Sequence, residues 1–281
     1  MQAALQTVTI GNVEIVPIVD THILMNPHHF VPQFADQFLA EYGQDADERG
    51  LFEMSITCFL VRSAGKTLLV DSGLGNRQRP GFPQGKLDES LREAGVDPGD
   101  IDAVLNTHLH IDHVGWNTID RPDGTRDIFF PNARFVIQQP EWDFWMTPER
   151  MAEPGNAHLV ECVEPLTSTG RIDFLSGESA FDENLTFVPS PGHTPGHVAI
   201  GIYSGGERAI IIGDASHHQV QLDHPDWSPA FDTDPVQSAR TRDRLFDEAA
   251  ADGRTWIAGH WPYPGMGRIV RLDGRRVFQA L

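Results

Sequence analysis

Residues 107–113 read Thr107-His108-Leu109-His110-Ile111-Asp112-His113, and no other run of the chain says more about its fold. The run directly follows apolar residues 101–106, which predict a short buried strand. Imidazole nitrogens and carboxylate oxygens are the natural ligands of zinc and related divalent ions. Three histidines and one aspartate this close together are improbable as a chance polar loop. The run therefore predicts a metal site at the end of a strand.

The spacing of the run indicates how its side chains divide. In an extended stretch His108, His110 and Asp112 fall on one face, because side chains alternate with a period of two. His113 then faces elsewhere and is free to serve a second ion. We therefore expect this run to contribute to two metal positions.

Three later residues have the same context, each at the end of an apolar strand candidate. His193 lies in the turn Pro191-Gly192-His193, Asp214 ends the run 209–214, and His260 follows residues 256–259. A neighbouring glycine lets the backbone approach closely in each case. Singly each residue could be structural, but together they complete one site.

Strand candidates dominate the rest of the chain, and helices fall between groups of them. A hairpin is expected over residues 8–20 around Gly11-Asn12, and a second turn is expected at Asp273-Gly274. Further strands are predicted over 54–61, 67–71, 101–106, 134–138, 185–189, 197–203, 209–212 and 256–258, and helices over 87–94 and from Pro235 to a stop at Gly253. Residues 22–50 read as a long loop, with a short helix near 34–42, and are a candidate lid or binding loop. The pattern predicts an α/β (α+β) protein with two sheets in a single domain over residues 1–281.

The intact H-x-H-x-D-H motif at 108–113, with the later histidine, aspartate and histidine in the same order, resembles the metallo-β-lactamase-fold hydrolases. The turn Asp71-Ser72-Gly73 is also similar to an early aspartate–glycine turn of that family. The resemblance covers roughly residues 10–270. It implies a four-layer αββα sandwich and a dinuclear metal site.

The resemblance also implies how the ligands divide. His108, His110 and His193 would hold one ion, Asp112, His113 and His260 the other, and Asp214 would bridge them. The expected cofactors are two divalent ions per chain, zinc first, with manganese, iron or cobalt as alternatives. The expected nucleophile is a hydroxide between the ions, since bound metal lowers the pKa of water towards neutrality. Asp112 is the expected catalytic participant, orienting the nucleophile or carrying a proton.

Two branches of the family are nearest in local sequence. One contains the N-acyl-homoserine lactonases, which place a tyrosine shortly after the bridging aspartate, where this chain has Asp214-Ala215-Ser216-His217-His218. His217 is the expected substitute, as a hydrogen-bond or proton donor, and His218 is a candidate substrate contact. The other branch is methyl parathion hydrolase, which the segments around Asp214, around Trp142 and after His260 resemble. The first expectation is therefore a lactone or other carboxylic ester as substrate, and the alternative is a phosphotriester.

Aromatic side chains are candidates for the wall of an apolar substrate pocket. They are Trp142, Phe144 and Trp145, together with Phe30 in the loop 22–50. If they line the site, the substrate is a small molecule with an apolar portion. A β-lactamase or a non-hydrolytic iron protein on the same fold is the weaker alternative, because every ligand position is filled and no flavin domain is evident.

Charge and composition exclude other classes of function. The net charge is −19 over 281 residues, which disfavours nucleic acid and anionic membranes as partners. Two cysteines without C-x-x-C spacing predict free thiols. The N-terminal sequence has no basic start followed by an apolar run, so a cytoplasmic enzyme is expected. A homodimer is one open alternative for the oligomeric state.

Overall fold

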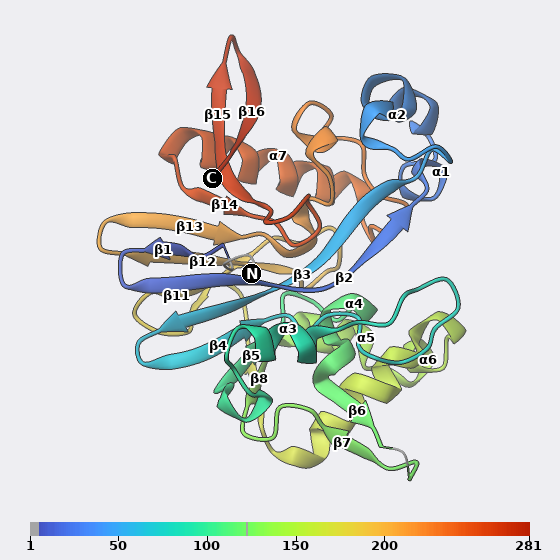
Figure 1. The fold of residues 1–281 in the computed structure, drawn as a ribbon, viewed down its shortest axis with the longest axis vertical. Coiled ribbons are helices and arrows are strands. Elements are labelled where there is room, and N and C mark those ends of the chain that lie inside the picture. The colour runs from blue at the N-terminus through green and yellow to red at the C-terminus, as the bar shows by residue number, and fades with distance from the viewer. Residues whose placement is uncertain (1–5, 122) are drawn as a thin grey trace.

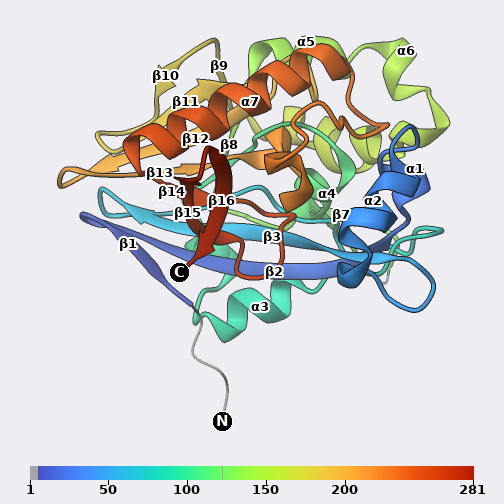
Figure 2. The ribbon, with the colours of Figure 1, turned by 90° about the horizontal axis from the view of Figure 1, so that it is seen from above.

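Two seven-stranded sheets pack face to face, and helices cover their outer faces (Figures 1 and 2). The computed structural model describes residues 6–121 and 123–281. In order across it, the first sheet contains β1 (Val8–Ile10), β2 (Val13–Met25), β3 (Phe52–Ser63), β4 (Lys66–Val70), β5 (Ala103–Leu105), β8 (Arg134–Gln138) and β9 (Ile172–Leu175). The second contains β10 (Ser179–Ala180), β11 (Leu185–Pro189), β12 (Val198–Ser204), β13 (Glu207–Ile211), β14 (Thr255–Ile257), β15 (Met266–Leu272) and β16 (Arg275–Ala280). A separate ribbon pairs β6 (Thr118–Asp120) with β7 (Arg126–Ile128).

The helices are short, apart from α7. They are α1 (Pro27–Phe30), α2 (Ala35–Tyr42), α3 (Leu87–Glu93), α4 (Ile111–Val114), α5 (Gln139–Trp145), α6 (Pro148–Met151) and α7 (Pro235–Asp252). Short segments of other helix types lie at Gly43–Asp45, Pro98–Asp100, Gly115–Asn117, Pro154–Asn156, Leu159–Val163, Glu164–Thr169, Gly213–Ala215 and Gln219–Leu222. No helix of the described ranges is both long and apolar enough to cross a membrane.

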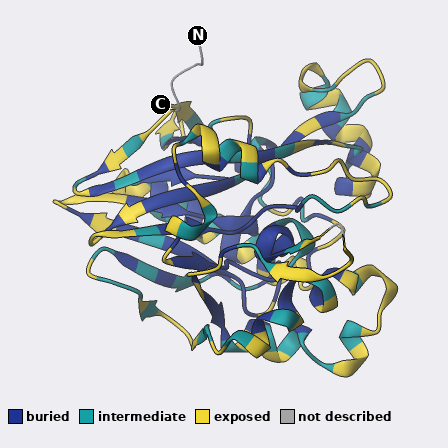
Figure 3. Ribbon diagram, turned by 60° about the horizontal axis from the view of Figure 1, so that its bottom comes forward, coloured by how far each residue is buried: buried dark blue, intermediate teal, exposed yellow. Residues whose placement is uncertain are grey.

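Three buried layers hold the sheets and helices together. Alternate residues of both sheets, such as Leu68 and Ile200, form the apolar layer between the sheets. Leu87 of α3 packs on the outer face of the first sheet, and Phe246 of α7 packs on the outer face of the second. Strands with both faces covered are accordingly buried along most of their length (Figure 3). This arrangement confirms the predicted αββα sandwich.

Most predicted elements are confirmed by the structure. The first hairpin turns at Gly11, whose φ of 56° suits glycine, and the last turns at Asp273-Gly274. Helix α7 begins after Asp234, whose side chain accepts a hydrogen bond from the Gln237 amide, and is followed by Gly253 in the left-handed conformation.

The prediction that residues 22–50 form a loop with a short helix is wrong at the start of this range. Strand β2 runs on to Met25 and pairs with β3 as far as Phe52. A bulge between Val19 and Thr21 interrupts the register, so the alternation of buried and exposed side chains changes phase there. The rest of the segment contains α1 and α2, the second of which matches the short helix expected near 34–42.

Candidate metal centre

The seven predicted ligands come from both sheets and meet at one point. They are His108, His110, Asp112 and His113 after β5, His193 after β11, Asp214 after β13 and His260 after β14. Apart from Asp112 and His110, these side chains are buried. The fold therefore brings seven side chains that are up to about 150 positions apart in the sequence into one buried polar cluster.

The first group of donor atoms surrounds one oxygen of Asp214. His110 Nδ1 lies 3.1 Å from His108 Nε2 and 2.8 Å from His193 Nε2. Asp214 Oδ2 lies 3.2 Å from His193 Nε2 and 3.6 Å from His108 Nε2. Three imidazole nitrogens and one carboxylate oxygen thus face a common centre.

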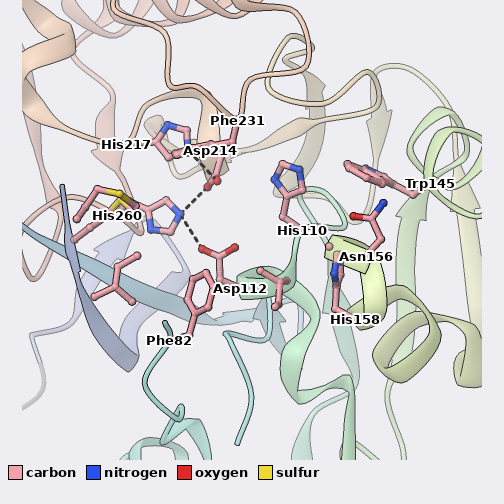
Figure 4. Close-up of a pocket in the computed structure, with 15 residues that line it drawn as sticks. Phe82, His110, Asp112, Trp145, Asn156, His158, Asp214, His217, Phe231 and His260 are labelled. Atoms are coloured by element: carbon pink, nitrogen blue, oxygen red, sulfur yellow. Dashed lines mark hydrogen bonds and ion pairs between the residues drawn. The ribbon is translucent and has the colours of Figure 1, made fainter. Parts of the chain in front are cut away.

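The second group surrounds the other oxygen of the same carboxylate. Asp214 Oδ1 lies 3.1 Å from His113 Nε2 and 3.0 Å from His260 Nε2. The Asp112 carboxylate closes the group, with its oxygens 3.7 Å from His113 Nε2 and 3.6 Å from His260 Nε2. Figure 4 shows Asp112, His260 and Asp214 turned towards one another.

The chemistry of these atoms fits two divalent cations. His113 Nε2 and Asp214 Oδ1 are buried and make no hydrogen bond within the described residues. Such atoms are costly to bury unless an ion or another donor satisfies them. The two oxygens of Asp214 face separate groups, so this one carboxylate could bridge two ions. Nitrogen and oxygen donors without thiolate suit zinc, manganese, iron or cobalt.

The predicted geometry of the motif is wrong in one respect. His108, His110 and Asp112 do not share the face of an extended strand, because the chain turns into α4 at Ile111. Asp112 and His113 are consecutive on the first turn of that helix and approach the second group together. The division of the motif between two groups nevertheless follows the predicted one.

Asp71 fixes the ring of His113 from behind. Its Oδ2 lies 2.9 Å from His113 Nδ1 and accepts the Thr107 hydroxyl proton at 2.8 Å, while its Oδ1 accepts the Thr107 amide proton. Asp71 has a φ of 60°, rare for a non-glycine residue, at the turn after β4. A carboxylate there orients the ring so that Nε2 points at the second group.

Asp232 has the same role for His193 and was not predicted. Its Oδ1 lies 2.8 Å from His193 Nδ1, and its Oδ2 lies 3.2 Å from the guanidinium of Arg242. All three side chains are buried. Asp232 lies in a stretch without periodicity or a ligand motif, and only the fold brings it next to the histidine.

Glu141 holds together the two loops that carry the first group. Its Oε1 accepts the Leu109 amide and the Trp145 indole N–H, and its Oε2 accepts the Gly196 amide at 3.0 Å. Leu109 lies between two ligands and Gly196 follows the third, His193. One buried carboxylate therefore sets the spacing of these loops.

Burial and the Asp214 carboxylate shift the pKa values of the buried donors in opposite directions. Burial would lower the pKa of His113, His193 and His260, but Asp214 raises it above the ordinary value, to about 9 for His193. Burial lowers the pKa of His108 and of His110 well below the ordinary value, and neighbouring histidines lower it further. Burial would raise the pKa of Asp214, but His113 and His260 hold it well below its usual range. Neutral imidazole and ionised carboxylate are the forms that bind a divalent ion.

Two further histidines lie beside the groups. His197 Nε2 accepts the Asp214 amide proton at 2.9 Å, and its Nδ1 faces the Ser190 hydroxyl. His217 Nε2 lies 3.1 Å from Asp214 Oδ2, and its ring stacks on that of His260. Burial lowers the pKa of His217 to about 4.

A pocket of about 270 Å³ opens onto the two groups of donors (Figure 4). It is lined by Ile23, Met25, Met54, Phe82, His110, Ile111, Asp112, Trp145, Gly155, Asn156, His158, Asp214, His217, Phe231 and His260. Apolar side chains make up about half of this wall, and the ligands form its floor. A small molecule with an apolar portion could therefore reach the centre.

The pocket includes only part of the predicted wall. Trp145 lines it, with its ring 5.2 Å from that of His110. Trp142 packs on Phe174 and Phe144 on Trp145, both outside the lining residues, because α5 directs one of its faces to the pocket.

Phe30 and His218 are also outside the lining residues. Both are buried beneath the wall, where Phe30 contacts the His217 ring and His218 packs between Phe38 and Phe52. The residues in their place are Ile23, Met25, Met54, Phe82 and Phe231, from segments with no ligand motif. In the sequence these apolar residues cannot be distinguished from residues of the hydrophobic core, so nothing there predicts that they line a pocket.

Comparison with known proteins agrees with this geometry. The family model described as the metallo-beta-lactamase superfamily matches residues 51–119 and 139–260. The N-acyl homoserine lactonase AttM of Rhizobium radiobacter is 29% identical over 191 residues, which cover 64% of this chain. The match spans only 65% of the length of that relative.

Two solved structures extend the comparison to the whole fold. A crystal structure of hydrolase AbOPH, of the beta lactamase superfamily, is 28% identical with a TM-score of 0.87 and covers 100% of this chain and 98% of its own. AidC, a dizinc quorum-quenching lactonase in complex with its product, is 24% identical with a TM-score of 0.81 and covers 99% of this chain and 97% of its own. The second likeness concerns the fold alone.

Proposed function

Because the chain belongs to the metallo-beta-lactamase superfamily, we propose that it is a metal-dependent hydrolase that opens a lactone or cleaves another carboxylic ester with an apolar portion. The observation that carries the proposal is the pair of donor groups around Asp214, each facing one oxygen of the carboxylate. In this proposal residues 1–281 act as one hydrolase domain.

The ligand assignment follows the two groups. In this proposal His108, His110 and His193 would hold one divalent ion, Asp112, His113 and His260 would hold the other, and the Asp214 carboxylate would serve both. Zinc is the first candidate. Divalent ions held there would supply activation of a water nucleophile and polarisation of the scissile carbonyl oxygen.

The chain supplies the remaining steps. Asp112 lines the pocket at the edge of the second group, where its carboxylate can hold a proton and orient the attacking water. His217 also lines the pocket, and its Nε2 lies 3.1 Å from Asp214 Oδ2. We assign to His217 the donation of a proton or hydrogen bond to the leaving oxygen.

The substrate class is supported by the pocket and by the named relatives. Ile23, Met54 and Phe82 offer an apolar surface next to the donor groups, and AttM is named as an N-acyl homoserine lactonase. The strong negative charge of the chain disfavours an anionic substrate or nucleic acid. A cytoplasmic location and a homodimer remain predictions.

A screen of purified, metal-loaded protein tests the proposal. We expect hydrolysis of medium-chain lactones at a higher kcat/KM than that of aryl esters, phosphotriesters or β-lactams. A higher kcat/KM for a neutral phosphotriester than for any lactone would support the phosphotriesterase alternative instead. Absence of hydrolysis of all four classes by protein that contains its metals would overturn the hydrolase assignment.

A further inference from the structure

Arg242 of α7 is a charged residue in the interior of the protein. Its side chain is 0% exposed and lies among the buried residues of the helix, next to the apolar core residues Leu245 and Phe246. Burying a charge is costly, and a paired buried charge often stabilises a fold no more than an apolar side chain of similar volume. Stability alone therefore does not explain an arginine at this position.

Each N–H donor of this guanidinium has an acceptor. The Nε atom donates to the Ala215 carbonyl at 2.8 Å. One terminal nitrogen donates to the Pro225 carbonyl at 2.6 Å and to the Ser228 hydroxyl at 3.5 Å. The other donates to the Asp232 carboxylate at 3.2 Å and to the Ser238 hydroxyl at 2.9 Å. All five donors are thus used, which the planar fork of an arginine allows and the single ammonium of a lysine does not.

Two of these acceptors belong to segments that carry the candidate site. Ala215 directly follows Asp214, in the turn that leads to His217. Asp232 has its other carboxylate oxygen 2.8 Å from His193 Nδ1. One buried cation therefore contacts both the residue behind a ring of the first group and the turn that carries the carboxylate shared by the two groups.

A rigid group in contact with both segments can fix their relative position. We propose that Arg242 is a positioning residue that orders two parts of the site at once. It keeps the Asp232 carboxylate against the ring of His193. Its bond to the Ala215 carbonyl keeps His217 directed at the pocket. The inference rests on the proposed function, in which His217 donates to the leaving oxygen, and adds to it a residue that acts only through others.

The variant Arg242→Met tests both parts, because it keeps an extended side chain and removes every donor. Zinc should bind the first group about tenfold more weakly, as for the loss of a residue that supports a ligand ring. The ratio of lactone turnover to activated aryl ester turnover should also fall about tenfold, since a displaced His217 protonates the leaving alkoxide less well. Competition with a coloured chelator measures the zinc affinity, and kcat of the fully metal-loaded protein on both substrates measures the ratio.

Two other replacements separate the two parts. Asp232→Asn should weaken zinc binding at the first group but leave the substrate ratio at its wild-type value. His217→Ala should lower the ratio by itself. Adding Arg242→Met to His217→Ala should then lower the ratio no further, because both changes act on the same residue. A further fall in the double variant would overturn the role assigned to the Ala215 contact.

A control and a conservative variant separate positioning from folding. Arg240→Met, at an exposed arginine of the same helix, should change neither the zinc affinity nor the ratio. Arg242→Lys keeps a charge beside Asp232 but cannot reach all the acceptors, and it carries the test if Arg242→Met does not fold. We expect this variant to keep the zinc affinity and to lose the substrate ratio. Wild-type values of both quantities would show that a charge suffices there, and would overturn the positioning role.

The outcomes distinguish this inference from the proposed function. If Arg242→Met unfolds at a lower urea concentration but keeps the zinc affinity and the substrate ratio, the arginine is structural only, and the lactonase assignment still stands. If the metal-loaded wild-type protein opens no lactone, the proposed function itself has failed. The zinc affinities of Arg242→Met and Asp232→Asn would then still test whether the arginine supports His193.

Discussion

Asp112 faces both the second donor group and the pocket, which gives it two roles at once. Asp112→Asn keeps the shape of the side chain but removes its charge and its ability to take a proton. We expect kcat to fall by about a hundredfold or more, as for loss of a general acid–base or electrostatic group. Elemental analysis of the same preparation separates lost chemistry from lost metal. Near-normal turnover would exclude Asp112 from the mechanism.

His217 should matter most for poor leaving groups. An alkoxide released from a lactone needs a proton, whereas a nitrophenolate does not. His217→Ala is therefore expected to lower lactone turnover much more than turnover of an activated aryl ester or phosphotriester. His218→Ala, one residue on and outside the pocket lining, is the matched control and should not discriminate between them. Equal losses on both substrates in His217→Ala would remove this residue as a proton donor.

Asp71 and Asp232 each hold one ligand ring, and the two rings belong to different groups. Asp71→Asn should weaken the ion held with His113, and Asp232→Asn the ion held with His193, each by about tenfold to a hundredfold. Competition of zinc with a coloured chelator measures both affinities. If either variant lowers the zinc affinity of both sites equally, the two aspartates do not support separate ions. Asp232→Asn should also lower stability, because Arg242 keeps a buried charge.

At this scale the sequence predicted the residues of the donor groups better than the residues of the pocket. For histidines and aspartates at strand ends, the residue type itself indicates metal binding, so seven of them could be named from the sequence. Met54 or Phe231 carries none, and becomes part of the wall only through the path of the chain. Asp232 was missed for the same reason, since its role depends on which ring lies above it.

Among the elements, the bulge in β2 sets up a pH-dependent contribution to stability. The bulge turns Asp20 inward, where its carboxylate accepts protons from the Leu74 and Leu87 amides and the Trp116 indole. Burial raises the pKa of Asp20 to about 6, although the hydrogen bonds that its carboxylate accepts lower the pKa in part. A carboxyl with a raised pKa in the folded state binds more protons than it does unfolded, so its contribution is lost as pH rises between about 4 and 6.

The variant Asp20→Asn tests this sign. We expect the unfolding free energy of the wild-type protein, relative to that of Asp20→Asn, to decrease by about 1–3 kcal/mol from pH 4 to pH 7. Urea denaturation of both proteins across this range measures the difference. A difference that increases with pH would mean that the three hydrogen bonds outweigh burial.

The same bulge limited prediction of the elements. One extra residue at Asp20 shifts the alternation that identifies a strand, and the stretch that follows reads as a loop. Helix α5 was missed for a different reason, because its aromatic residues were interpreted as a pocket wall without regard to a helical period. Elements with clear stops, such as α7 between Pro235 and Gly253, were predicted almost to the residue.

For the whole molecule, the metal centre joins the two sheets. Four ligands follow a strand of the first sheet and three follow strands of the second. We expect about two divalent ions per chain by elemental analysis, and a fall in Tm when a chelator removes them, since ions that bind only the folded state stabilise it. A reproducible value near one ion with full activity would contradict the two-ion proposal. An unchanged Tm after complete removal would mean that the sheets need no ions to stay together.

The separate origin of wall and floor has a consequence for how such a protein changes over generations. The floor depends on loops locked by Asp71, Asp232 and Glu141, where few replacements fit. The apolar wall comes instead from the far ends of β2 and β3 and from the connections around Phe82 and Phe231. Mutations there can alter which molecule enters without disturbing the reaction that follows. During evolution the substrate range of such proteins can therefore diverge while the reaction itself is conserved.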